Sequence, residues 1–201
     1  MRKPDSLSDI HDFGIDVKNR TIYLHTLDEK DVDYNMSAQF IKNLDFLSNA
    51  SKMPIKIKIL GSDGGDLSHG LAMYSAIKEC KCEVNTYCLG RICSSMTIIL
   101  QAATNRYLHA YTDFMLHTGS ISLDQTSLSA RSTLRWNNYL SKLMLDIYAD
   151  RCQNGVFFTD RKYSRSRVRS YLDTKMKNEG DVWLTSQEAV NMGFADEVYY
   201  E

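Results

Sequence analysis

Proline is scarce in this sequence: only Pro4 and Pro54 occur among 201 residues, and no low-complexity tract or internal repeat is present. This scarcity argues against a proline-rich linker, and the length fits one domain of ordinary size. An excess of either charge is also missing, since the formal net charge is −1 at pH 7. A nearly neutral chain argues against a general nucleic-acid binder or a protein held on anionic membranes.

Long hydrophobic runs are missing too. The longest apolar stretch, around residues 98–100, is far too short to cross a bilayer, and residues 1–14 lack the apolar core of a secretion signal. We therefore expect no membrane association and a cytoplasmic location.

The cysteines form an odd set without the spacing of a disulfide framework, so we expect reduced thiols. They are Cys80, Cys82, Cys88, Cys93 and Cys152. Cys80-x-Cys82 could bind a metal, but no second pair of ligands accompanies it. We predict neither a metal nor a cofactor.

Hydrophobic periodicity divides the chain into alternating strands and helices. The predicted strands are 21–25, 55–60, 84–88, 106–108, 112–116 and an edge strand at 195–200; the predicted helices are 33–48, a segment after Gly65, 96–103 and a long region ending near Cys152. Strand, glycine turn, helix and strand form a βαβ unit, which predicts parallel strands in an α/β fold. Near the C-terminus, Thr185 and Glu188 form a capping box, and Gly193 ends the short helix that follows. The basic segment 161–169 is interpreted as a solvated helix face.

Two polar turns interrupt this pattern. Gly64 and Gly65 follow the strand at 55–60, where they form either a tight turn or a backbone that approaches a ligand closely. The spacing matches neither a dinucleotide fingerprint nor a P-loop. Ser94 and Ser95 precede the apolar helix at 96–103, where a serine is most often a helix cap. A serine at a sharp strand-to-helix turn is alternatively an exposed nucleophile, because the unpaired N–H groups beside it suit a developing anion.

The order of these features resembles the Clp protease proteolytic subunit, ClpP, a family of self-compartmentalised serine peptidases. The resemblance rests on the glycine pair, on the G-x-x-x-S motif from Gly90 to Ser94, and on the apolar helix that follows. The spacing from Gly65 to Ser94 fits the family without a gap, which makes Ser94 the implied nucleophile. Ser95 is the alternative nucleophile, but choosing it requires an insertion and a compensating deletion.

Two further segments carry the same resemblance. Phe114-Met115-Leu116-His117, preceded by Arg106, is similar to the segment that ends in the family's catalytic histidine. The run from Asp181 to Val190, followed by Gly193 and Asp196, is similar to its C-terminal motif. The resemblance implies that His117 is the base, that Asp181 orients it, and that Asp196 is structural. It also implies an oxyanion hole formed by the N–H groups of Gly65 and Ser95. The other histidines, His11, His25, His69 and His109, are interpreted as structural or surface residues.

The resemblance covers about residues 13–200, so we expect a polar leader at 1–12 and one peptidase domain at 13–201. It implies a crotonase-like α/β core of repeated β-β-α units and a helical handle at about 119–152. It also implies heptameric rings or double-ring tetradecamers, fed with unfolded protein or peptide by an AAA+ unfoldase. Asp63 stands where the family commonly has proline, which indicates a divergent branch; a viral or phage origin is one interpretation. Two alternatives remain: a non-catalytic structural ring subunit, and a crotonase-type acyl-CoA enzyme on the same fold.

Overall fold

The computed structural model describes residues 7–25, 31–119 and 126–200. Residues 1–6 of the predicted leader and 120–125 of the predicted handle lie outside this part. The helices are α1 (Leu7–Phe13), α2 (Tyr34–Ala50), α3 (Leu67–Glu79), α4 (Ser95–Gln101), α5 (Ser127–Cys152), α6 (Val156–Thr159), α7 (Arg165–Glu179) and α8 (Ser186–Asn191). The strands are β1 (Ile15–Asp16), β2 (Thr21–His25), β3 (Ile55–Gly61), β4 (Val84–Cys88), β5 (Arg91–Cys93), β6 (Asn105–His109), β7 (Asp113–Leu116), β8 (Val182–Leu184) and β9 (Glu197–Tyr199).

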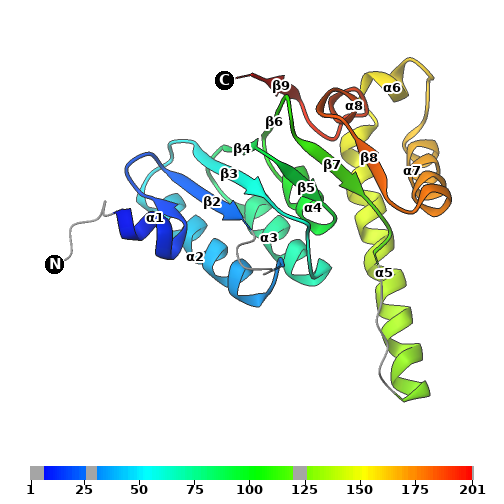
Figure 1. The fold of residues 1–201 in the computed structure, drawn as a ribbon, viewed down its shortest axis with the longest axis horizontal. Coiled ribbons are helices and arrows are strands. Elements are labelled where there is room, and N and C mark those ends of the chain that lie inside the picture. Colours follow the sequence, from blue (N-terminus) through cyan, green and yellow to red (C-terminus); the bar gives the residue numbers. More distant parts are fainter. Residues whose placement is uncertain (1–6, 26–30, 120–125, 201) are drawn as a thin grey trace.

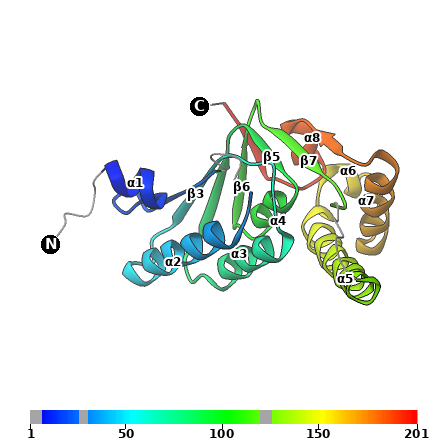
Figure 2. The same ribbon diagram turned by 60° about the horizontal axis from the view of Figure 1, so that its bottom comes forward.

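The larger sheet has the strand order β1-β2-β3-β4-β6-β9 (Figure 1). All neighbouring strands in it are parallel except the antiparallel pair β1 and β2. The alternation in β3 explains its place, because Ile55, Ile57 and Ile59 are fully buried while Lys56 is exposed on the opposite face. Helices α2, α3 and α4 lie along one side of these strands (Figure 2).

Helix α2 shows how local sequence positions the core. Asp33 caps its N-terminus by accepting a hydrogen bond from the N–H of Met36 at 2.8 Å. Phe40, Leu44 and Leu47 then follow at helical spacing and are each 1% exposed. They belong to the same hydrophobic core as the isoleucines of β3.

The smaller sheet has the order β5-β7-β8, with β5 parallel and β8 antiparallel to β7. Beside it stands the long helix α5, whose N-terminal half extends beyond the rest of the chain (Figure 1). The C-terminal half of α5 is anchored by buried residues such as Met144 and Tyr148. Arg165 and Arg169 on α7 pair with Asp146 on α5. Most of the basic segment 161–169 is exposed, as expected, but the helix begins only at Arg165.

The predicted α/β fold is confirmed, and so are the parallel strands, the edge strand β9 and the capping box at Thr185. The sequence pattern missed the short strands β1, β5 and β8, since two or three residues are too few to show an alternation. It also missed the short helices α1 and α6. It also placed the start of α4 one residue late, at Met96 rather than Ser95.

Candidate active site

Ser94 occupies the sharp turn between β5 and α4. Its backbone has φ 54° and ψ −126°, a conformation that residues with a side chain rarely adopt. Its N–H donates to the carbonyl of Met115 on β7 at 3.0 Å, which ties the turn to the neighbouring strand. Ser94 occupies the N-cap position of α4, as the helix-cap interpretation expected, but its side chain makes no capping hydrogen bond.

The Ser94 hydroxyl instead meets His117, the residue that follows β7. The distance from Ser94 Oγ to His117 Nε2 is 2.7 Å. On the other side of the ring, His117 Nδ1 lies 3.4 Å from Asp181 Oδ1, just before β8. A serine hydroxyl that donates to Nε2 requires the ring proton on Nδ1, where it faces the Asp181 carboxylate. Three segments far apart in the sequence thus form one Ser–His–Asp line.

The Gly64-Gly65 turn packs directly against this serine. A Cβ added to Gly64 would lie 2.5 Å from the Ser94 Cβ, so only glycine allows this approach. The buried Ser62 hydroxyl accepts the N–H of Gly64 at 3.0 Å and holds the turn in place. Gly65 has φ +149°, and a Cβ there would lie 2.4 Å from the backbone nitrogen of Val32. Of the two predicted oxyanion-hole residues, Ser95 begins α4 directly after Ser94. Gly65 packs against Val32, and it is Gly64, the residue before it, that contacts Ser94.

The neighbours of Ser94 have different surroundings. Ser95 is 3% exposed, and within the described ranges its buried hydroxyl has no hydrogen-bond partner. Burial, together with the nearby charge of Asp63, raises the pKa of the Cys93 thiol to about 12, so the thiol stays protonated near neutral pH. Other histidines have other contacts: His69 Nδ1 lies 3.4 Å from Ser37 Oγ, and His109 packs against Tyr199.

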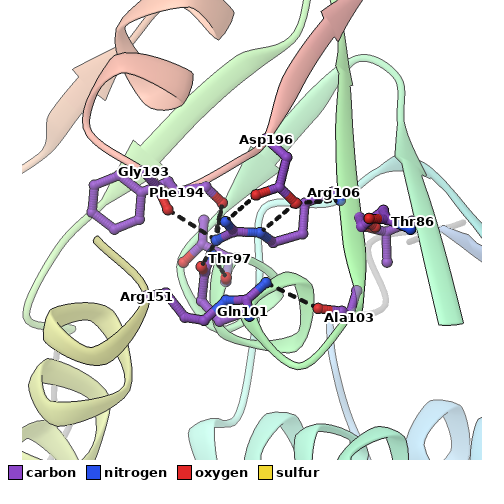
Figure 3. A network of polar contacts seen from close by, with 10 residues as sticks. Thr86, Thr97, Gln101, Ala103, Arg106, Arg151, Gly193, Phe194 and Asp196 are labelled. Atoms are coloured by element: carbon purple, nitrogen blue, oxygen red, sulfur yellow. Dashed lines mark hydrogen bonds and ion pairs between the residues drawn. The ribbon is translucent and has the colours of Figure 1, made fainter. Parts of the chain in front are cut away.

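Helix α4 is anchored by Arg106 on β6, which is 4% exposed (Figure 3). The guanidinium donates to Asp196 through Nε at 3.1 Å and to Gln101 Oε1 through Nη1 at 2.7 Å. Gln101 also donates to the Phe194 carbonyl at 3.1 Å, so α4 and the C-terminal segment share one polar network. Burial alone would raise the pKa of Asp196, but the hydrogen bonds and positive charge of Arg106 lower it overall. This geometry gives Asp196 the structural position expected of it.

Outside this region, the possible metal pair has protein partners of its own. Cys82 Sγ donates to the Ser51 carbonyl at 3.2 Å and lies 3.7 Å from the Arg20 guanidinium. All five cysteines are free thiols. Among residues 7–25, 31–119 and 126–200 there is no group of three or more metal-ligating side chains placed to hold an ion. In the same part of the chain, no helix combines the length and the apolar character needed to cross a membrane.

The sequence and the fold are both similar to those of known proteins. The Clp protease family profile fits residues 13–201. The ATP-dependent Clp protease proteolytic subunit 2 of Chlamydia abortus is 26% identical over 161 residues, which cover 77% of this chain and 69% of the relative. The ATP-dependent Clp protease proteolytic subunit of Bdellovibrio bacteriovorus is 29% identical over 185 residues, covering 90% and 79%. A solved ClpP1 mutant from Listeria monocytogenes has a TM-score of 0.71 at 18% identity, covering 92% of this chain and 94% of that chain.

The two sheets and the helices around them define an α/β protein with the ClpP fold. The chain belongs to the Clp protease family, a family of peptidases. Identities below 30% to the relatives above make it a divergent member, as the departures in its motifs predicted.

Proposed function

We propose that this protein is a ClpP-type serine endopeptidase in which Ser94 is the nucleophile, His117 the general base and Asp181 the residue that orients the base. The observation that carries the proposal is the 2.7 Å contact between Ser94 Oγ and His117 Nε2 at a strained turn. A hydroxyl is barely nucleophilic near neutral pH, so a base at hydrogen-bond distance is what makes this serine reactive.

The proposed reaction is acyl transfer. Ser94 Oγ attacks the peptide carbonyl carbon while its proton moves to His117 Nε2, and the carbonyl oxygen becomes an oxyanion. The N–H groups of Gly65 and Ser95 stabilise that charge, and Asp181 stabilises the imidazolium. The C–N bond then breaks as Nε2 returns the proton to the amine. Water repeats the cycle on the acyl-enzyme and releases the acid.

The protein relatives are named as ATP-dependent protease subunits. We extend the proposal accordingly: this chain assembles into heptameric rings or double rings and cleaves unfolded protein or peptide supplied by an AAA+ unfoldase in the cytoplasm. The exposed apolar residues on the protruding half of α5 support assembly, because such a surface is poorly suited to water.

The test is labelling with a fluorophosphonate, followed by intact-mass analysis and peptide mapping. We expect one adduct, on Ser94, that is lost in Ser94→Ala and kept in Ser95→Ala. An adduct on Ser95 would move the nucleophile by one residue. An assembled protein that takes no label and cleaves no peptide would contradict the proposal and favour the structural ring subunit, and acyl-CoA binding would favour the crotonase-type enzyme.

A further inference from the structure

A chain of buried hydroxyl groups leads from the long helix α5 to the backbone of Ser94. The Tyr148 hydroxyl lies 2.6 Å from Thr97 Oγ1, and Thr97 Oγ1 lies 2.6 Å from the carbonyl oxygen of Ser94. Tyr148 is 1% exposed and Thr97 is fully buried. These bonds are therefore shielded from water, which makes each of them stronger than it would be at the surface.

The chemistry of the three groups decides which atom donates. A carbonyl oxygen can only accept, so Thr97 gives its single hydroxyl proton to Ser94. The Thr97 oxygen is then left to accept the proton of Tyr148. Burial raises the pKa of the Tyr148 phenol, which keeps this donor protonated. Each hydroxyl proton makes one hydrogen bond, and the hydrogen bonds all point the same way, from α5 to Ser94.

The end of this chain is the peptide group between Ser94 and Ser95. Its carbonyl accepts both the hydroxyl of Thr97 and, at 3.0 Å, the N–H of Thr97. The N–H of the same peptide group belongs to Ser95 and is one of the two proposed oxyanion donors. Two donors on one carbonyl fix the plane of the peptide, and they polarise it so that its N–H becomes a better donor.

Strain at Ser94 makes such support necessary. A non-glycine residue at φ 54° persists only when its surroundings hold it there. Tyr148 is itself held by an edge-to-face contact with Phe194, at 5.3 Å between ring centroids, and Phe194 packs against Phe114 at 5.4 Å. Phe114 precedes Met115, the residue whose carbonyl accepts the N–H of Ser94. The strained turn is thus held on both sides by one packed cluster.

We propose that Thr97 and Tyr148 are positioning residues for the oxyanion hole: they hold the Ser94–Ser95 peptide so that its N–H faces the negative charge of the transition state. The proposal rests on the proposed function of Ser94. Neither side chain touches the substrate. Helix α5 contributes to the reaction through a buried hydroxyl 51 positions away in sequence from Thr97.

The test compares four variants with the wild type. Thr97→Val and Tyr148→Phe remove one hydroxyl each at nearly constant shape, and Thr97→Ser keeps the hydroxyl. Thr86→Val is the matched control, because Thr86 is also fully buried but bonds to Asn105 on the neighbouring strand. The measurements are kcat and KM on a fluorogenic peptide, and the affinity for a peptide boronate, whose tetrahedral adduct occupies the oxyanion hole.

Loss of a whole oxyanion donor typically costs about 100- to 1,000-fold in kcat, so a misaligned donor should cost about tenfold. We expect Thr97→Val to lose about tenfold in kcat and in boronate affinity with KM nearly unchanged, and Tyr148→Phe to lose about threefold in the same direction. Thr97→Ser and Thr86→Val should stay near the wild type. A kcat loss without a matching loss of boronate affinity would overturn the proposal, as would full activity in both hydroxyl-deletion variants.

Amide hydrogen exchange tests whether Thr97 and Tyr148 restrain this turn, and it does not depend on enzyme activity. We expect the peptide covering Ser95–Gln101 to exchange faster in Thr97→Val and Tyr148→Phe than in the wild type or Thr86→Val. Unchanged exchange in both hydroxyl-deletion variants overturns the proposal. If the wild type takes no fluorophosphonate label at Ser94, the proposed function fails, while hydrogen exchange still decides whether the Tyr148–Thr97 chain holds this turn.

Discussion

Gly64 and Ser94 touch so closely that a single methyl group between them would create a clash, with only 2.5 Å separating the added Cβ from the Ser94 Cβ. The contact joins the turn after β3 to the turn before α4. It therefore fixes the distance between the proposed nucleophile and the proposed oxyanion donor on Gly65. An added Cβ at Gly64 would meet the Cβ of Ser94, which is attached directly to the backbone. The clash could therefore be relieved only by moving one of the two turns.

We expect Gly64→Ala to lower kcat/KM by about 100-fold, because even a misplacement of about 1 Å at an active site can cost that much. Gly61→Ala is the control. Gly61 also has a positive φ, of 144°, but its added Cβ would lie 3.9 Å from the nearest atoms, an ordinary contact. Peptide cleavage and thermal unfolding of both variants separate backbone strain from the clash. Equal activity in the two variants would contradict the importance of this contact.

Asp181→Asn tests the third member of the Ser–His–Asp line. The carboxylate lies 3.4 Å from His117 Nδ1 and its side chain is 58% exposed, so its removal should leave folding intact. An asparagine neither stabilises the imidazolium nor enforces the tautomer, and we expect kcat to fall by at least about 100-fold. The unfolding midpoint should stay within about 2 °C of the wild type, as for most surface substitutions. Wild-type kcat in this variant would remove Asp181 from the mechanism.

Asp196→Asn should show the opposite pattern. It leaves the buried Arg106 without its carboxylate partner, and we expect a loss of about 2 kcal/mol in the free energy of unfolding, reduced by the partial exposure of Asp196. Protein that remains folded should keep most of its kcat. A variant that unfolds like the wild type would show that the carbonyl groups around Arg106 satisfy the buried guanidinium without the carboxylate.

The same pair predicts a pH dependence of stability. Since the folded pKa of Asp196 lies below its ordinary value of 3.8, the carboxylate stabilises the fold above that value. This contribution is lost as the pH falls through the lowered pKa. We expect the unfolding midpoint of the wild type to drop as the pH falls below the ordinary value of 3.8, and the drop to be smaller in Asp196→Asn. Parallel curves for the two proteins would contradict this assignment.

The sequence predicted those parts of the fold whose signal is local. The alternation in β3 predicted its buried face because period-2 burial follows directly from strand geometry. The capping box at Thr185 likewise involves residues three positions apart. The short strand β5 has no such signal, since its three residues acquire their structure by pairing with β7.

The candidate site could be predicted only in part, for the same physical reason. Nothing in the periodicity brings Ser94 to His117; that expectation came from resemblance. The Thr97–Tyr148 contact had no signal at all, because a threonine and a tyrosine on apolar helices are ordinary core residues. Only the packing of α4 against α5 turns their hydroxyls into a pair.

Assembly provides the last test, on the protruding half of α5. Trp136 is 58% exposed and Tyr139 is 49% exposed, and their rings pack against each other at 5.2 Å between centroids. In an isolated protomer this aromatic pair is exposed to water, so its apolar surface gives no hydrophobic stabilisation. If a second copy of the chain covers it, Trp136→Glu buries a charge at that contact. We expect the assembled mass, measured by sedimentation velocity, to fall to half or less.

Val156→Glu is the control, because Val156 is 59% exposed on α6, well away from this part of α5 (Figure 1). An unchanged mass in Trp136→Glu would place the assembly contacts elsewhere on the chain.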